Sequence, residues 1–192
     1  MTEPIETAFE APVTGAAAIG RSLRAWRALR QVKQSYAAEL LGVSQATISR
    51  WESGSLLPLV VQERSLRQLM SARVDAAADH ELARLVADAR EPMHLVCDLT
   101  HRLLAASPGR TREWGTSAAE LLGVSLWRYA TDEIREAERS LPGRGWYEPA
   151  PPVVLVWTSA NRSRAVHIPA SRFRWIRFPL SDGSHARLVR AA

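Results

Sequence analysis

The chain has 192 residues, of which 46% are hydrophobic and 23% are charged. This composition excludes an intrinsically disordered chain and allows two small domains, each with its own core. The formal net charge of +5 favours a polyanionic partner, and the single cysteine, Cys97, excludes an internal disulfide. Nearly all of the 25 positive charges are arginines, a bias typical of a GC-rich bacterial genome. Because no apolar run approaches the roughly 18 residues of a membrane span, we expect a cytoplasmic bacterial protein without membrane contact.

Residues 1–17 are rich in Pro, Thr, Glu and Ala and lack a hydrophobic period, which predicts a disordered tail. A helix is expected at 19–30, with an apolar stripe on one side and arginines on the other. The arginine side either approaches phosphate groups or is an ordinary solvated face.

The segment 34–51, QSYAAELLGVSQATISRW, contains two short helical patterns that meet at Gly42. In the second pattern Ile48 and Trp51 fall at helical spacing, and Ser44 stands where it would cap the helix N-terminus. Glycine tolerates the left-handed backbone that a tight turn between two helices needs. The segment therefore predicts a helix-turn-helix more strongly than an ordinary helical hairpin.

Once the cap and core positions are set aside, the second helix presents polar and small side chains outward. Amide, hydroxyl and guanidinium groups read base edges and hold phosphates in protein–DNA complexes. The outward residues are Gln45, Ala46, Thr47, Ser49 and Arg50. This helix predicts binding to double-stranded DNA.

Residues 18–72 resemble the helix-turn-helix domain of Cro/cI-type (XRE) transcriptional regulators. Gln34 opens the first motif helix, Ala38 and Gly42 hold the close-packed and turn positions, and the run ISRWESG closes the motif. The resemblance implies a five-helix domain with its recognition helix at 44–52, which would lie in the major groove.

The same resemblance assigns roles to individual side chains. It implies that Arg27 and Glu52 form a buried ion pair between the first helix and the end of the recognition helix; two independent surface charges are the alternative. It also implies that Gln34 steadies Gln45, whose amide matches N6 and N7 of an adenine. Arg50 would reach a guanine or a phosphate, or else form a surface salt bridge. The candidate DNA-contacting residues are Lys33, Gln34, Ser44, Gln45, Ala46, Thr47, Ser49, Arg50 and Ser53.

Residues 73–91 are expected to connect the two domains through a helix. Its apolar stripe consists of Leu82, Leu85, Val86 and Ala89. The stripe either packs on the second domain or contacts a second protomer. About two heptads are too few for a self-sufficient coiled coil, so we expect dimerisation to be assisted by the neighbouring domain.

Residues 92–192 change to short apolar runs separated by turn residues, which predicts strands. Strands are expected at 93–97, 102–106, 153–159, 165–169, 172–179 and 185–189, and short helices at 118–122 and 133–141. Pro108 and Gly109 are expected to break the chain. The chain as a whole is predicted to be α+β, with an all-α domain followed by an antiparallel sheet packed against helices.

This second domain resembles a PAS domain over roughly residues 80–192. The likeness is carried by the helix ELARLVADA, the hairpin runs MHLVCD and HRLLAAS, and the segment LLGVSLWRY. It implies a domain at 92–192 that dimerises and senses a signal, with a ligand that the sequence does not identify.

Known cofactor signatures are absent from the sequence of this domain. The histidines at 94, 101, 167 and 185 lack metal-ligand spacing, and Cys97 falls in an expected strand, not in the helix that carries the reactive cysteine of flavin-binding PAS domains. The tryptophans at 114, 127, 146, 157 and 175 are expected in the core or at a dimer interface. The acidic run at 132–138 is expected to be a solvated helix face. No catalytic arrangement is visible, so we expect neither an enzyme nor a bound metal or cofactor.

Near the C-terminus, Arg172 and Arg174 alternate with Phe173 and Trp175. A strand would turn the two aromatic rings inward and both arginines toward solvent. We expect these arginines to pair with acids in 133–138 and not to contact DNA.

Together the two domains predict a sequence-specific DNA-binding transcriptional regulator that acts as a homodimer. Two alternatives remain open. The first is an antitoxin-type or adaptor module whose second domain binds a protein partner. The second is a sensor of haem or another small molecule through the PAS-like domain.

Overall fold

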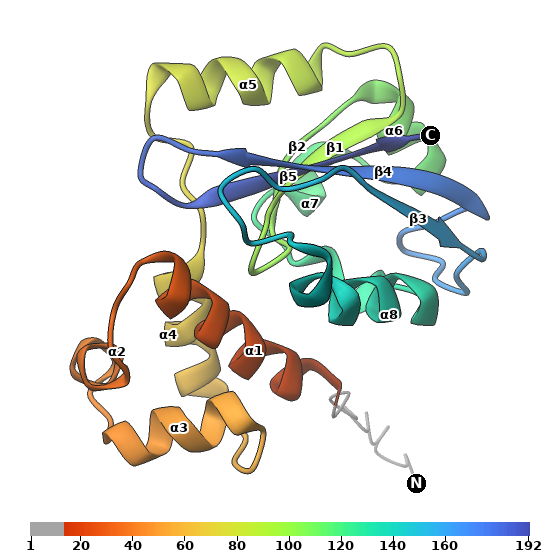
Figure 1. The fold of residues 1–192 in the computed structure, drawn as a ribbon. Helices are drawn as coiled ribbons and strands as arrows, with labels where there is room; N and C mark the ends of the chain where they lie inside the picture. Colours follow the sequence, from red (N-terminus) through yellow and green to blue (C-terminus); the bar gives the residue numbers. More distant parts are fainter. Residues whose placement is uncertain (1–13) are drawn as a thin grey trace, which may run out of the picture.

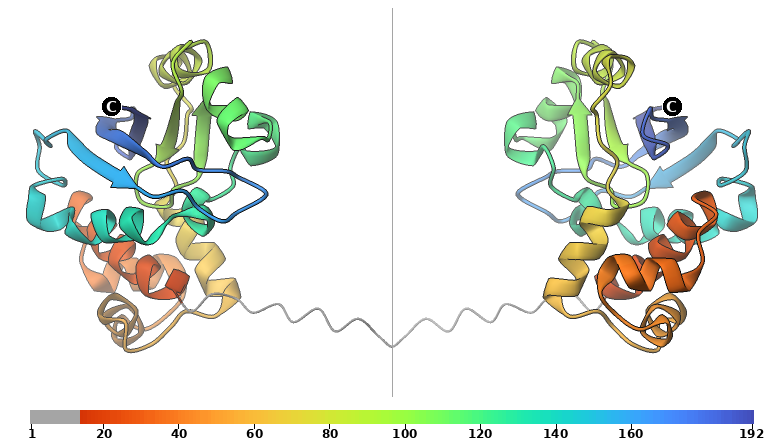
Figure 2. Two further views of the ribbon diagram at one scale, coloured as in Figure 1. Left: turned by 90° about the vertical axis from the view of Figure 1, so that its right-hand side faces the viewer. Right: turned by 90° about the vertical axis from the view of Figure 1, so that its left-hand side faces the viewer.

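The computed structural model describes residues 14–192, with side chains from residue 19 onward. Four helices come first and pack together at one end of the molecule (Figures 1 and 2). They are α1 (Thr14–Leu29), α2 (Gln34–Leu41), α3 (Gln45–Ser53) and α4 (Val60–Met70). Residues 1–13 of the predicted tail lie outside the described residues. Residues 14–17 belong to α1, so the tail boundary predicted at residue 17 falls too late.

Local sequence explains where α2 and α3 end and begin. Gly42 ends α2 in the left-handed region with a φ of 63°, a conformation that costs glycine little. Ser44 then caps α3, because its side chain accepts a hydrogen bond from the N–H of Thr47 at 3.1 Å. Ile48 and Trp51 turn inward and are only 0% and 2% exposed. The local sequence thus places the turn, the cap and the buried side of α3 where the motif predicts them.

The rest of the chain forms a five-stranded sheet with helices on both faces (Figure 1). The strands are β1 (Met93–Cys97), β2 (Leu103–Ala106), β3 (Val154–Thr158), β4 (Ser171–Pro179) and β5 (His185–Ala191). They lie in the order β2-β1-β5-β4-β3, and every neighbouring pair is antiparallel. The predicted α+β architecture, all-α first and sheet second, is confirmed.

Short helices between β2 and β3 cover one face of the sheet, which we call the inner face. On the opposite, outer face, α5 (Ala77–Ala87) lies against β1 and β2 (Figure 1). The inner elements are α6 (Pro108–Trp114), α7 (Ala118–Leu121), η1 (Leu126–Tyr129), α8 (Asp132–Ser140) and η2 (Pro142–Arg144). Within residues 14–192, no helix is long and apolar enough to cross a membrane.

Two predictions about this region are wrong. Pro108 begins α6 instead of breaking the chain, because proline loses no hydrogen bond at the first helical position and Ser107 caps the helix. The strand predicted at 165–169 does not form. Its backbone is held by the side chain of Asn161, which donates to the carbonyl of Val166 at 3.0 Å and accepts from the N–H of Ile168 at 2.9 Å.

The apolar stripe of α5 is divided between the sheet and solvent. Val86 is buried and Leu82 half-buried in a cluster with strands β1, β2 and β5, whereas Leu85 is 63% exposed. Ala89 lies beyond the last helical residue. Packing on the second domain is therefore what the structure shows for Leu82 and Val86, and these two residues are not available as predicted dimer contacts.

The two domains touch through the turn that joins β1 to β2. Leu99 in this turn packs against the core of the four helices, and its carbonyl accepts a hydrogen bond from Ser22 Oγ of α1 at 3.0 Å. At the end of β1, Cys97 Sγ accepts a hydrogen bond from the N–H of Ala72 at 3.2 Å. The sheet is thus attached to both α1 and the segment after α4.

Candidate nucleic-acid interface and buried cavity

The outward side of α3 is the first candidate site. Gln45, Ala46, Ser49 and Arg50 are exposed, and Thr47 is half-buried. Because Ile48 and Trp51 anchor the opposite side in the core, the outward side chains occupy one face of a fixed helix. Within residues 19–192, Arg50 makes no ion pair, so its guanidinium is available to an anionic partner.

Three hydroxyl groups at this site are already engaged in local hydrogen bonds. Ser44 Oγ, besides capping the helix, shares a hydrogen bond with Thr47 Oγ1 at 2.9 Å. Ser53 Oγ donates to the carbonyl of Arg50 at 3.1 Å. These bonds stabilise both ends of α3 and fix where its exposed residues lie.

Gln34 lies against Glu52 instead of Gln45. Its Nε2 donates to Glu52 Oε2 at 3.0 Å, while Arg27 Nε and Nη2 donate to the two oxygens of Glu52 at 2.6 and 2.8 Å. Burial opposes the ionisation of Glu52, but the hydrogen bonds from Arg27 and Gln34 outweigh it and lower the pKa of this carboxyl. Arg27 also donates to the carbonyl of Val32 at 2.9 Å. The three side chains together fix α1 and the start of α2 to the end of α3.

A second candidate site is a cavity of about 80 Å³ between the inner face of the sheet and the elements α6, η1 and α8. Its lining residues are His94, Val96, His101, Arg110, Trp114, Leu126, Trp127, Tyr129, Ala130, Ile134, Val166, Ile168, Phe173, Trp175, Arg187 and Val189. Pockets for drug-sized ligands measure roughly 300–1,000 Å³. The cavity therefore suits a molecule of a few heavy atoms and does not fit a haem.

Three of the tryptophans, Trp114, Trp146 and Trp175, are buried in the core as predicted, and two of them, Trp114 and Trp175, also line the cavity. Trp127 lines the cavity as well, whereas Trp157 is 56% exposed. Aromatic rings that face a space offer a small ligand flat apolar contact surface.

Polar groups also stand at the cavity wall. Burial, and then the charges of Arg110 and Arg187, lower the pKa of His94 well below its usual value, so that its imidazole is neutral near pH 7. Among the described residues, His94 Nδ1 and Trp127 Nε1 are buried without a hydrogen-bond partner. No group of three or more His, Cys, Asp or Glu side chains in residues 19–192 could hold a metal ion. The wall thus provides an apolar surface with a few unsatisfied polar atoms.

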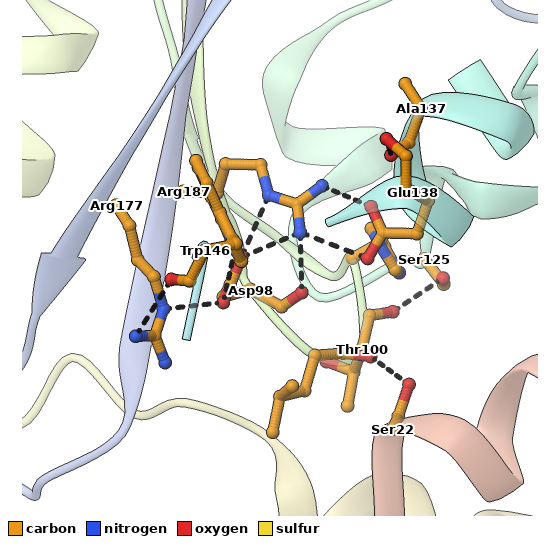
Figure 3. Close-up of polar contacts among 12 residues, drawn as sticks. Ser22, Asp98, Thr100, Ser125, Ala137, Glu138, Trp146, Arg177 and Arg187 are labelled. Atoms are coloured by element: carbon orange, nitrogen blue, oxygen red, sulfur yellow. Dashed lines mark hydrogen bonds and ion pairs between the residues drawn. The ribbon is translucent and has the colours of Figure 1, made fainter. Parts of the chain in front are cut away.

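A buried ion network lies beside the cavity and centres on Asp98, which is 0% exposed (Figure 3). Its carboxylate accepts hydrogen bonds from Arg177 Nε and Arg187 Nε, both at 2.9 Å, and from Trp146 Nε1 at 3.1 Å. Arg187 continues to Glu138 through its Nη1 at 2.5 Å. Although burial of Glu138 opposes ionisation, the charge of Arg187 lowers the pKa of this carboxyl far below its usual value. The network joins β1, β4, β5 and α8.

This network corrects two predictions from the sequence. The run 132–138 is not simply a solvated face, because Glu138 is half-buried and forms an ion pair with Arg187. The expected pairing of Arg172 and Arg174 with acids of this run is absent: Glu136 pairs with Arg139, and Glu133 accepts from Ser159 Oγ at 2.7 Å. The alternation of inward and outward side chains along β4 was the sequence signal that the prediction did not extend to Arg177. It turns Phe173 and Trp175 inward as predicted, and it turns Arg177 inward with them.

Comparison with known proteins follows the division of the chain. Residues 23–59 match the family model described as Helix-turn-helix. No curated protein sequence matches the chain. The PAS domain of an HTR-like protein from Haloarcula marismortui is similar with 15% identity and a TM-score of 0.43, over 60% of this chain and 90% of that one. The PAS domain of a two-component sensor histidine kinase is similar with 13% identity and a TM-score of 0.43, over 59% of this chain and 93% of that one.

A third solved structure, an RNA-binding light-oxygen-voltage receptor, is similar with 17% identity and a TM-score of 0.40. That match covers 92% of this chain and 59% of the receptor chain. The family model thus covers the helix-turn-helix at residues 23–59, and the solved structures to which the chain is similar include PAS domains and a light-oxygen-voltage receptor.

Proposed function

We propose that the protein is a transcriptional regulator that binds a specific sequence of double-stranded DNA in the cytoplasm of a bacterium. The observation that supports this most directly is α3, which presents Gln45, Ala46, Ser49 and Arg50 to solvent while Ile48 and Trp51 hold it in the core. A helix of this kind, fixed at both ends, enters the major groove with its first residues against the base edges.

The proposed contacts differ along the helix. Gln45 stands at the start of α3, where its amide offers a donor and an acceptor to one adenine. Ala46 and the methyl group of Thr47 suit a thymine methyl, and Arg50 suits a guanine or a phosphate. Phosphate contacts are assigned to the exposed Lys33 and to Ser44, Ser49 and Ser53. Gln34, bound to Glu52, is assigned to positioning and to a phosphate through its remaining amide oxygen.

We also propose that the protein acts as a homodimer. One recognition helix reads too few base pairs for useful discrimination, since each correct pair contributes about 1–3 kcal/mol. Two helices one DNA turn apart, roughly 34 Å, would read a palindrome. Exposed apolar residues on β3, Leu155 at 63% and Trp157 at 56%, offer a surface for the second protomer.

A second function, sensing a small molecule, is favoured by the cavity in the sheet domain. It combines aromatic walls with the unpaired polar atoms of His94 and Trp127. We propose an uncharged ligand of a few heavy atoms, because the nearby Arg110 and Arg187 already have the acidic partners Glu113 and Glu138.

Selection of bound sequences from random duplex DNA tests the DNA-binding function. The selected site is then used to compare the wild type with Gln45→Ala. Gln68→Ala changes an exposed glutamine of α4 and is the matched control. We expect Gln45→Ala to lose about 1–3 kcal/mol per half-site, concentrated at one base position, with no change for the control. Failure of the wild type to enrich any sequence would overturn the proposal.

A further inference from the structure

The stacked side chains of His101 and Trp127 separate the cavity from the helical domain. Their ring centroids are 4.6 Å apart and their planes are inclined by 27°. Both rings line the cavity, and both also line a small crevice on the other side, where Ile19 and Ser22 of α1 form the opposite wall. One pair of rings therefore faces the cavity on one side and α1 on the other.

The backbone beside this pair is firmly attached to η1, which carries Trp127. The carbonyl of His101 accepts a hydrogen bond from the N–H of Leu126 at 2.9 Å. The carbonyl of Thr100 accepts one from Ser125 Oγ at 2.8 Å (Figure 3). A displacement of Trp127 therefore displaces the β1–β2 turn as well.

The same turn is fixed at one end and bears on α1 at the other. Asp98 is held by Arg177 and Arg187, so displacement is confined to the residues that follow it (Figure 3). His101 has a φ of 56°, a left-handed conformation that is strained for a residue with a Cβ and needs support from its surroundings. Two residues earlier, Leu99 packs on the helical core, and its carbonyl accepts the hydrogen bond from Ser22 Oγ.

We infer that the state of the cavity is transmitted to the recognition helix through residues 99–101, by way of α1. The inference rests on the sensor function proposed above. A filled cavity holds the His101–Trp127 pair in place and presses Leu99 against α1, while an empty one leaves the turn freer to move. Because α1 packs directly on α3, the position of the exposed face of α3 depends on this contact.

The test fills the cavity with a larger side chain of the protein itself, so that the ligand does not have to be identified. Ala130→Leu adds three carbon atoms at a lining residue, and Ala130→Val adds two in case the first variant folds poorly. Ala150→Leu, at an exposed loop residue, is the matched control. Hydrogen–deuterium exchange is measured for peptides covering η1, residues 99–101, α1 and α3 in the full chain. We expect the cavity-filling substitution to slow hydrogen exchange in all four peptides by about fivefold, which is the lower end of the usual allosteric coupling between two sites.

The decisive step repeats the filling in a chain with Ser22→Ala and Leu99→Ala, which lacks the contact with α1. We expect slower exchange to persist in η1 and to disappear from α1 and α3. Arg30→Gln, at the residue that follows α1 and lies beside Gly183 in the β4–β5 turn, should leave the effect intact. Equal slowing of α1 with and without the Ser22 and Leu99 contacts overturns the inference, as does slowing of η1 alone in the first experiment. Failure of phenol and imidazole to bind the wild type counts against the sensor function only, because the filled variants need no ligand.

Discussion

Gly20 of α1 lies so close to Trp51 of α3 that a Cβ on Gly20 would stand 1.9 Å from the carbonyl oxygen of Trp51. This oxygen belongs to the backbone and cannot swing away, so the two helices would have to separate. We predict that Gly20→Ala destabilises the helical domain by roughly 1–3 kcal/mol or more, the usual range for overpacking. Thermal unfolding followed by circular dichroism measures the loss.

Gly143→Ala is the matched control for this prediction. A Cβ there meets no atom within 4 Å, so we expect a change within about 0.5 kcal/mol. Equal stability of the Gly20 and Gly143 variants would show that the helices do not cross as closely as described.

The helical domain follows closely from the sequence because its signals are local. The turn at Gly42, the cap at Ser44 and the inward Ile48 and Trp51 are set by residues a few positions apart. The position of Gln34 against Glu52, eighteen residues away, depends on how two helices cross. For the same reason, the sequence did not reveal that Gln34 bonds to Glu52 and not to Gln45.

The ion network in the sheet domain was missed because its members are distant in the chain. Asp98 and Arg187 are 89 residues apart, and Glu138 lies between them. Strand alternation alone places Arg177 on the inward face beside Trp175, but it does not supply the acid that neutralises it. The cavity was missed because it depends on side chains from seven separate parts of the chain leaving a space between them.

We predict that Asp98→Asn strongly destabilises the sheet domain. The substitution leaves two buried guanidinium groups, those of Arg177 and Arg187, without a shared counter-charge. Breaking a buried ion pair in this way costs about 3–5 kcal/mol. Urea unfolding monitored by tryptophan fluorescence measures the cost, because Trp146 bonds directly to Asp98. Glu136→Gln disrupts only a surface pair with Arg139 and should change stability by less than about 1 kcal/mol.

The protonation of His94 makes the free energy of unfolding depend on pH. Its folded-state pKa is depressed by burial and by Arg110 and Arg187, whereas in the unfolded chain it titrates near 6.5. Below about pH 6.5 the unfolded state therefore binds more protons, and stability falls as pH falls, by up to about 1.4 kcal/mol per pH unit. We predict that His94→Gln reduces this slope between pH 6.5 and 5, as measured by urea unfolding, and that the remaining slope includes the contribution of His185, whose pKa burial also lowers. His80→Gln, an exposed histidine of α5, should retain it; the same slope in both variants would contradict the assignment.

Two apolar patches are exposed, and the proposed dimer predicts that the patch on β3 lies in the interface and the other does not. β3 ends the sheet, so Leu155 and Trp157 stand beside unpaired backbone groups. A second patch, at the start of α4, exposes Val60 by 76% and Val61 by 74%. We predict that Leu155→Glu/Trp157→Glu converts the protein to a monomer in sedimentation velocity experiments. Val60→Glu/Val61→Glu should remain dimeric, and the opposite result would move the interface to the helical domain.

The last prediction concerns which arginines touch DNA. Arg50 is exposed on α3, whereas Arg172 and Arg174 are exposed on the outer face of the sheet, the side that carries α5 and that is turned away from α3 (Figure 1). Each phosphate contact contributes roughly −0.9 to the slope of log K against log salt. If Arg50 holds a phosphate, Arg50→Ala makes the slope shallower by about 0.9 per protomer, and we predict this change. Arg172→Ala/Arg174→Ala should leave the slope as it is in the wild type, because these guanidinium groups lie too far from the major groove to release counterions. A slope that becomes shallower in the double variant would mean that DNA wraps onto the sheet domain, and the proposed interface would then have to include β4.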